Sequence, residues 1–136
     1  MWRLSPTAHQ MIQQPSILLT DDDLGFRETL RAMLEPRGYR TFEAGDGLEA
    51  LDIVTRESIH LVLLDYHMPK LTGIETMRRV KQVRELLPCI LVSAEMDEQM
   101  RREAEAAQVY SVLTKPVSLS QVTSTVDDAL RATYGW

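Results

Sequence analysis

The sequence predicts an α/β fold in which five parallel strands form an open sheet with helices on both faces. The alternation of two kinds of segment along the chain predicts it. Short apolar runs alternate five times with longer segments whose apolar residues recur at helical spacing, and such alternation produces parallel strands joined by right-handed crossovers. The chain has 136 residues, 44% hydrophobic and 26% charged, which suits one domain with an ordinary core.

Five runs are predicted as strands because they are short, apolar and partly β-branched. In chain order they are residues 16–20, 39–44, 61–64, 89–93 and 110–114. The third run, Leu-Val-Leu-Leu, is apolar throughout. A strand that helices cover on both faces is expected to have this composition.

Five segments are predicted as helices from the spacing of their apolar residues. In chain order they are residues 24–35, 45–56, 73–86, 97–107 and 118–132. The first stops before Pro36 and Gly38, which end helices. The third is expected to turn Val83 inward with the apolar residues before it, and Ser118 is the expected N-cap of the last.

Residues 1–15 contain two prolines and little periodicity, so we expect a loose N-terminal tail and one domain over residues 16–136. The net charge of −5, with no evident basic face, argues against a nucleic-acid-binding protein. No run approaches the ~20 apolar residues of a membrane span, and no signal peptide is evident. The lone Cys89, among apolar neighbours, predicts a buried thiol and fits a reducing compartment, so the cytoplasm is expected.

Chemically active side chains follow four of the five predicted strands. They are Asp21, Asp22 and Asp23 after the first, Asp65 after the third, Ser93 at the end of the fourth, and Lys115 after the fifth. Because ligands of open α/β sheets bind outside the carboxyl ends of the strands, we expect these groups to form one site. Each has an ordinary structural explanation alone, such as a solvated turn or a helix N-cap for the triplet. Their joint placement at one edge is what predicts a function.

The chemistry of this set indicates phosphoryl transfer. Carboxylate oxygens suit Mg²⁺, which neutralises phosphoryl oxygens during transfer. An aspartate can act as the nucleophile and form an acyl phosphate. A lysine ammonium is a compact charge suited to a phosphoryl oxygen, and a serine hydroxyl can donate to another.

The ordered motifs resemble those of the receiver domain of response regulators in two-component signalling. The matching segments are residues 17–23, 61–69 with Gly73, 90–94 and 113–116. The resemblance implies a flavodoxin-like three-layer sandwich with strand order 2-1-3-4-5. It also implies a role for each site residue.

By this resemblance, Asp65 is the phosphoacceptor. The implied metal ion is Mg²⁺ or Mn²⁺, bound by Asp22, Asp65 and the backbone carbonyl of His67, with Asp21 acting through a water molecule. Ser93 with its neighbour Ala94 corresponds to the switch position, and Lys115 to the lysine that pairs first with the acceptor and then with the phosphoryl group. The Lys115–Pro116 bond is expected to be cis.

Further positions concern the lifetime and output of the signal. His67 and Glu95, two residues beyond Asp65 and Ser93, are expected to flank the phosphoryl group and tune its hydrolysis. Val112 stands where the family often has a switch aromatic, so the familiar aromatic rotamer change is not expected. Gln108 stands where a glycine is common, and since a left-handed Gln costs roughly 1 kcal/mol, we expect that turn to differ.

The expected function is therefore a stand-alone receiver that accepts a phosphoryl group from a histidine kinase or phosphotransfer protein and catalyses only its own phosphorylation and dephosphorylation. Its downstream partner is unknown and is expected at the face formed by residues 94–132; homodimer formation is left open. An aspartyl-phosphate phosphatase is a second hypothesis, but such enzymes commonly need Asp-x-Asp where this chain has Asp65-Tyr66-His67. A scaffold that acts without phosphorylation is a third, against which the intact set of site residues argues.

Overall fold

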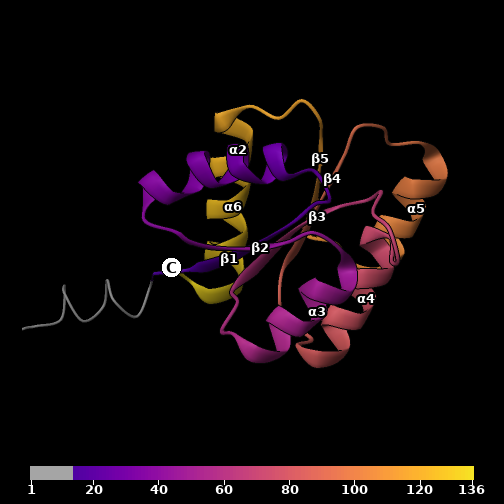
Figure 1. Cartoon of the computed structure of the whole chain (residues 1–136), viewed down its shortest axis with the longest axis horizontal. Helices are drawn as coiled ribbons and strands as arrows, with labels where there is room; N and C mark the ends of the chain where they lie inside the picture. Colours follow the sequence, from indigo (N-terminus) through magenta and orange to yellow (C-terminus); the bar gives the residue numbers. More distant parts are fainter. Residues whose placement is uncertain (1–13) are drawn as a thin grey trace, which may run out of the picture.

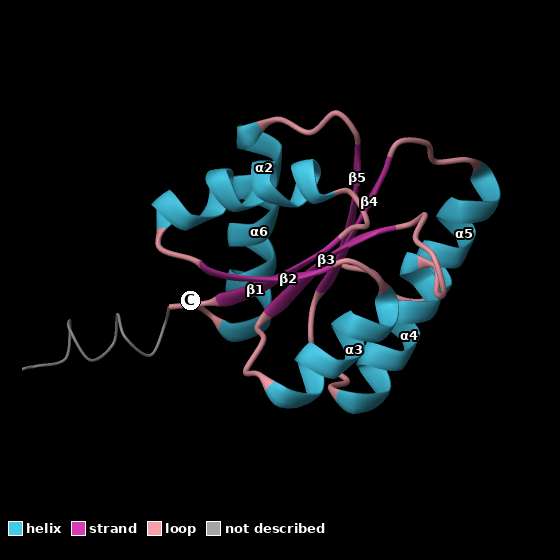
Figure 2. Ribbon diagram, viewed as in Figure 1, coloured by secondary structure: helices cyan, strands magenta, loops and turns pink. Residues whose placement is uncertain are grey.

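The computed structural model describes residues 14–136 (Figures 1 and 2). Residues 1–13 of the expected tail lie outside the described residues. Pro15, which that expectation included, is buried, and its carbonyl accepts a hydrogen bond of 2.9 Å from the backbone N–H of Arg40. Pro15, one residue before the first strand, therefore pairs with the start of the second strand.

All five strands are parallel, in the order β2-β1-β3-β4-β5, which confirms the flavodoxin-like fold. They are β1 (Ser16–Thr20), β2 (Arg40–Ala44), β3 (Leu61–Asp65), β4 (Cys89–Ser93) and β5 (Ser111–Thr114). Asp65 lies opposite Val92, and Ser93 lies opposite Thr114. The polar ends of these strands therefore share one edge of the sheet.

Five helices cover the sheet. They are α2 (Leu24–Leu34), α3 (Gly47–Arg56), α4 (Gly73–Val83), α5 (Glu98–Ala106) and α6 (Leu119–Tyr134), with a 3₁₀ turn, η1 (Glu35–Arg37), after α2. Helices α2 and α6 lie on one face, and α3, α4 and α5 lie on the other (Figure 1). The five helices expected from the sequence are thus present, in three layers with the sheet.

The core lies in two layers because side chains of a strand alternate between its two faces. Leu18 of β1 packs with Met77 of α4 in one layer, and Leu19 packs with Val126 of α6 in the other. Cys89 is fully buried, as expected of a small apolar side chain. Burial raises the pKa of its thiol to about 12, which leaves it unreactive at neutral pH.

Helix α4 ends sooner than the sequence predicts. It stops at Val83, and Arg84 adopts an extended backbone conformation. The Arg84 guanidinium donates to the backbone carbonyl of Glu57 at 2.7 Å, so the arginine packs against the distant turn that follows α3. The predicted inward placement of Val83 is wrong, since 51% of this residue is exposed.

Two local predictions concern helix ends. Ser118 is the N-cap of α6, and its hydroxyl accepts a hydrogen bond from the backbone N–H of Gln121. Gln108, after α5, has φ 62°, so this residue adopts the left-handed conformation despite its cost, and the expectation that the turn would avoid it is wrong. A glycine would adopt this conformation without strain, which makes Gln108 a place where stability can be gained.

Candidate functional site

The three consecutive aspartates after β1 have three different surroundings. Asp21 is 2% exposed, whereas Asp22 is exposed to solvent. Asp23 is the N-cap of α2, and its carboxylate accepts a hydrogen bond of 2.9 Å from the backbone N–H of Gly25. The N-cap explanation of the triplet is therefore right for Asp23, and Asp21 and Asp22 remain for the site.

Asp65 ends β3 and is 7% exposed. Burial raises the pKa of its carboxyl to about 6, and Asp21 and Asp22 add to the rise, while Lys115 opposes it. Gly73 makes room for this residue, because a Cβ at Gly73 would lie 2.3 Å from the Asp65 carbonyl oxygen. Asp65 is thus a buried carboxylate whose negative charge is only partly compensated.

Asp21, Asp22 and Asp65 form an acidic cluster in which one oxygen of each lies within 4.8 Å of the others. Oxygen ligands from a few carboxylates suit Mg²⁺ or Mn²⁺, so the donor set fits the expected ion. The backbone N–H of His67 also contributes at this place, since its hydrogen bond lowers the pKa of Asp65. The cluster therefore combines an accessible carboxylate, Asp22, with two buried ones.

Lys115 supplies the positive charge of the site. Its Nζ lies 2.9 Å from Oδ2 of Asp21 and 3.8 Å from Oδ1 of Asp65. The same Nζ lies 4.1 Å from the centre of the Phe26 ring, a contact that cation–π attraction favours. The lysine thus contacts Asp21 more closely than Asp65, although the resemblance implies pairing with Asp65.

Ser93, at the end of β4, is fully buried. Its hydroxyl donates to the backbone carbonyl of Glu95 and accepts from the Glu95 N–H at 3.3 Å. The backbone carbonyl of Ser93 accepts from the N–H of Lys115 at 2.8 Å, and the Lys115–Pro116 bond is cis. The serine hydroxyl is thus engaged within its own turn and would have to leave that turn to contact a ligand.

The remaining predicted site residues lie at the rim. His67, Ala94 and Glu95 are exposed, and Val112 is partly buried in the layer that contains α3, α4 and α5. The imidazole of His67 lies edge-on to the ring of Tyr66, with 4.8 Å between ring centres. These positions border the edge that carries the acidic cluster without adding to the cluster itself.

Two neighbours of the site were not predicted from the sequence. Phe26 lies under Lys115, and the Tyr66 hydroxyl donates to Oε1 of Glu103 at 2.7 Å. Tyr66 follows Asp65 directly, so its position in the chain was a signal of proximity. Its partner Glu103 lies 37 residues away on a surface helix, and no local pattern indicates that contact.

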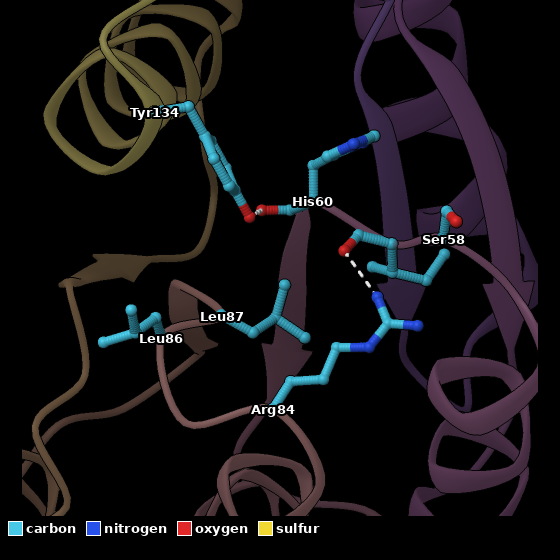
Figure 3. A pocket seen from close by; sticks show the side chains of 7 residues that line it. Ser58, His60, Arg84, Leu86, Leu87 and Tyr134 are labelled. Carbon is cyan, nitrogen blue, oxygen red and sulfur yellow. Dashed lines mark hydrogen bonds between the residues drawn. The ribbon is translucent and has the colours of Figure 1, made fainter.

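A hollow of about 420 Å³ lies away from this site, near the amino ends of β3 and β4 (Figure 3). Polar groups in its wall are already paired with the chain. Arg84 donates to the carbonyl of Ile59 at 3.2 Å, and the Tyr134 hydroxyl donates to the carbonyl of His60 at 2.8 Å. This pairing favours a structural role for the hollow, so the acidic cluster is the stronger candidate site.

The comparison with protein families identifies the family of this chain. The family model described as "Response regulator receiver domain" matches residues 17–127. The chain belongs to this family. Receiver domains are phosphoacceptor modules of two-component signalling that interact with histidine kinases or phosphotransfer proteins, and they generally bind Mg²⁺.

Individual relatives agree with the receiver-domain assignment. Sporulation initiation phosphotransferase F of Bacillus subtilis is 36% identical over 110 residues, which are 81% of this chain and 89% of the relative. Transcriptional regulatory protein ZraR of Klebsiella oxytoca is 32% identical over 121 residues, and the chain spans 27% of its length. The chain spans 51% of the response regulator MprA of Mycobacterium leprae, at 34% identity.

Solved structures support the same fold. A CheY-like response regulator receiver domain protein from Methanospirillum hungatei superposes with a TM-score of 0.87, at 22% identity, over 90% of this chain and 98% of that one. The receiver domain of Francisella response regulator 1452 has a TM-score of 0.81 at 27% identity, over 88% and 98% of the two chains. Among residues 14–136, none of the helices has the length and apolarity needed to span a membrane.

Proposed function

We propose that the protein is a single-domain response regulator that accepts a phosphoryl group on Asp65. One observation carries this proposal: a buried carboxylate lies beside two more carboxylates and 3.8 Å from an ammonium group, at the sheet edge where ligands bind. The match to 89% of the length of a sporulation phosphotransferase supports the single-domain form. The phosphodonor is a histidine kinase or a phosphotransfer protein, as the family implies.

In the proposed reaction, a carboxylate oxygen of Asp65 attacks the phosphorus of a phosphohistidine. The new O–P bond forms as the P–N bond breaks, and the electron pair of the P–N bond goes to the imidazole nitrogen of the donor. The pKa of about 6 leaves Asp65 mostly ionised at neutral pH, as a nucleophile must be. Its burial limits the water that could hydrolyse the acyl phosphate.

A bound Mg²⁺ or Mn²⁺ would neutralise the charge of the phosphoryl oxygens during transfer. The residues proposed to hold it are Asp22, Asp65 and the backbone carbonyl of His67, with Asp21 acting through water. Lys115 supplies a second positive charge. Its ammonium group contacts both Asp21 and Asp65. A small displacement of this group would therefore be enough for it to contact an oxygen of a phosphoryl group on Asp65.

The switch is proposed at the end of β4. Ser93 would exchange its hydrogen bond with the Glu95 carbonyl for one with a phosphoryl oxygen, and the segment from Ala94 onward would move with it. This change would reach a partner through the face formed by residues 94–132. With Val112 in place of an aromatic ring, the movement of this segment carries the change. The exposed side chains of His67 and Glu95 are proposed to set the rate of hydrolysis.

The proposed activity is limited to the protein's own phosphorylation and dephosphorylation. The exposed imidazole of His67 stands where an aspartyl-phosphate phosphatase commonly has its second acid, and an imidazole cannot supply the negative charge of that carboxylate. The expected compartment is the cytoplasm, since the one cysteine of the chain is a buried thiol.

Phosphorylation with a small donor tests the proposal. Incubation with acetyl phosphate and Mg²⁺ should add one phosphoryl group, detected by intact-protein mass spectrometry. Asp65→Asn should abolish the addition, and the matched control Asp52→Asn, on the exposed side of α3, should not. Undiminished labelling of Asp65→Asn would refute the assignment of the acceptor.

Metal binding tests which aspartates of the triplet bind the ion and which one only caps α2. In calorimetric titrations with Mg²⁺, Asp22→Ala should weaken binding more than Asp21→Ala. Asp23→Ala should leave the affinity unchanged and lower the unfolding free energy by about 1 kcal/mol, because it removes an N-cap. If Asp23→Ala weakens Mg²⁺ binding most, the ligands have been assigned to the wrong residues.

A further inference from the structure

Helix α5 has one polar side-chain connection to the rest of the molecule. Among residues 14–136, the hydrogen bond of 2.7 Å from the Tyr66 hydroxyl to Glu103 is the only side-chain hydrogen bond or ion pair that joins α5 to another element. The helix buries only Met100 and Ala104. Its position therefore depends on two apolar residues and this bond.

The other end of the connection is fixed next to Asp65. The backbone N–H of Tyr66 donates to the Val92 carbonyl at 3.0 Å, and the Tyr66 carbonyl accepts from Gly73 N–H at 2.9 Å. Tyr66 is thus held by β4 and by the start of α4. Its neighbour in the chain is Asp65, the proposed phosphoacceptor.

The chemistry of the pair favours a stable bond in the unphosphorylated protein. The Tyr66 hydroxyl donates a hydrogen bond to Oε1 of Glu103 at 2.7 Å, and a hydrogen bond to a carboxylate is stronger than one between neutral groups. Tyr66, Ala104 and Val112 pack in the same apolar layer. Val112 stands where the family often has an aromatic residue and has no hydroxyl. In this layer, Tyr66 is the residue whose hydroxyl bonds to α5.

We infer that the Tyr66–Glu103 hydrogen bond holds α5 in its unphosphorylated position and is released when Asp65 is phosphorylated. This inference rests on the proposed function. Phosphorylation adds negative charge beside Tyr66 and draws Ser93 out of its turn. The segment that follows Ser93 leads to Asp97, the N-cap of α5, so the helix is pulled from its N-terminus. A ligand shifts the equilibrium between two positions of α5 only through its different affinity for them. The Tyr66–Glu103 hydrogen bond, which we call the tether, is present in one position and absent in the other.

Removing the tether should therefore imitate phosphorylation at α5 alone. In amide NMR spectra without a phosphoryl mimic, Tyr66→Phe and Glu103→Ala should move the α5 resonances toward the positions that the wild type shows with Mg²⁺ and beryllofluoride. Hydrogen exchange of α5 amides should become about tenfold faster in both variants. The double variant should match the single ones, because both substitutions remove the same bond.

Two matched controls test whether the effect is specific. Tyr110→Phe removes the hydroxyl of an exposed tyrosine, and Glu105→Ala truncates an exposed glutamate on α5. Neither should change the α5 resonances as the tether variants do. Shifts of α5 in Tyr66→Phe no larger than those in Tyr110→Phe would overturn the inference.

Failure of the inference can be separated from failure of the proposed function. If beryllofluoride shifts resonances around Asp65 in the wild type but leaves α5 unchanged, the tether is not a switch and the inference is wrong. If the wild type neither responds to beryllofluoride nor accepts a phosphoryl group from acetyl phosphate, the proposed function fails. A full wild-type response of α5 in Tyr66→Phe would also contradict the tether.

Discussion

Asp65→Asn should stabilise the metal-free protein at neutral pH. Burial and the neighbouring carboxylates raise the pKa of Asp65 from 3.8 to about 6, so ionising this group opposes folding. A shift of about two units corresponds to about 3 kcal/mol at pH 7.5, where the group is ionised in both the folded and unfolded states. Asparagine carries no charge and escapes this cost.

The sign of the effect fixes its pH dependence. Because the folded pKa lies above the unfolded one, stability is lost as the pH rises through the range between the two values. The advantage of Asp65→Asn over the wild type should therefore shrink by about 2 kcal/mol between pH 7.5 and pH 4.5. Urea unfolding in EDTA, followed by circular dichroism at both pH values, measures this difference.

The control is Asp52→Asn, which changes an exposed aspartate on α3. Its stability relative to the wild type should be nearly independent of pH over the same range. If Asp65→Asn is no more stable than the wild type at pH 7.5, or if its advantage is the same at pH 4.5, then the buried charge of Asp65 is compensated and the description of the site is wrong.

Three further predictions concern stability and are checked by chemical denaturation. Gln108→Gly should raise the unfolding free energy by about 1 kcal/mol, because glycine relieves the left-handed conformation; a loss would contradict the strain. Gly73→Ala should lower the unfolding free energy by about 2 kcal/mol, since the new Cβ would clash with the Asp65 backbone. An unchanged unfolding free energy would mean that the backbone moves to relieve the clash without cost. His60 accepts a hydrogen bond from Ser16 N–H, and burial lowers its pKa, so the wild type should lose more stability than His60→Gln below about pH 6.5; parallel curves would refute this.

The fold could be predicted because its signals are local and repeated. A strand buried on both faces, such as β3, must be apolar throughout, and five alternations leave few possible connections. The strand order came from the resemblance, since periodicity does not order parallel strands. The predicted inward placement of Val83 was wrong because α4 ends there, where Arg84 packs against carbonyls of a distant turn.

The candidate site was predictable to the level of its residues but not of their pairing. The rule that strand ends share an edge brought Asp21, Asp22 and Asp65 together, as the structure does. The same rule does not reveal that Lys115 contacts Asp21 more closely than Asp65. Contacts such as Tyr66 with Glu103 depend on where a surface helix packs, and no spacing in the sequence encodes that position.

Asp65 is proposed to carry the phosphoryl group, and chemical labelling can locate that group on the chain. The protein is phosphorylated with acetyl phosphate and Mg²⁺, and the acyl phosphate is then reduced with borohydride, which converts the modified aspartate to homoserine. Peptide sequencing by mass spectrometry should find homoserine at position 65. Homoserine at position 21 or 22 instead, or at no aspartate of a protein that has gained a phosphoryl group, would contradict the account.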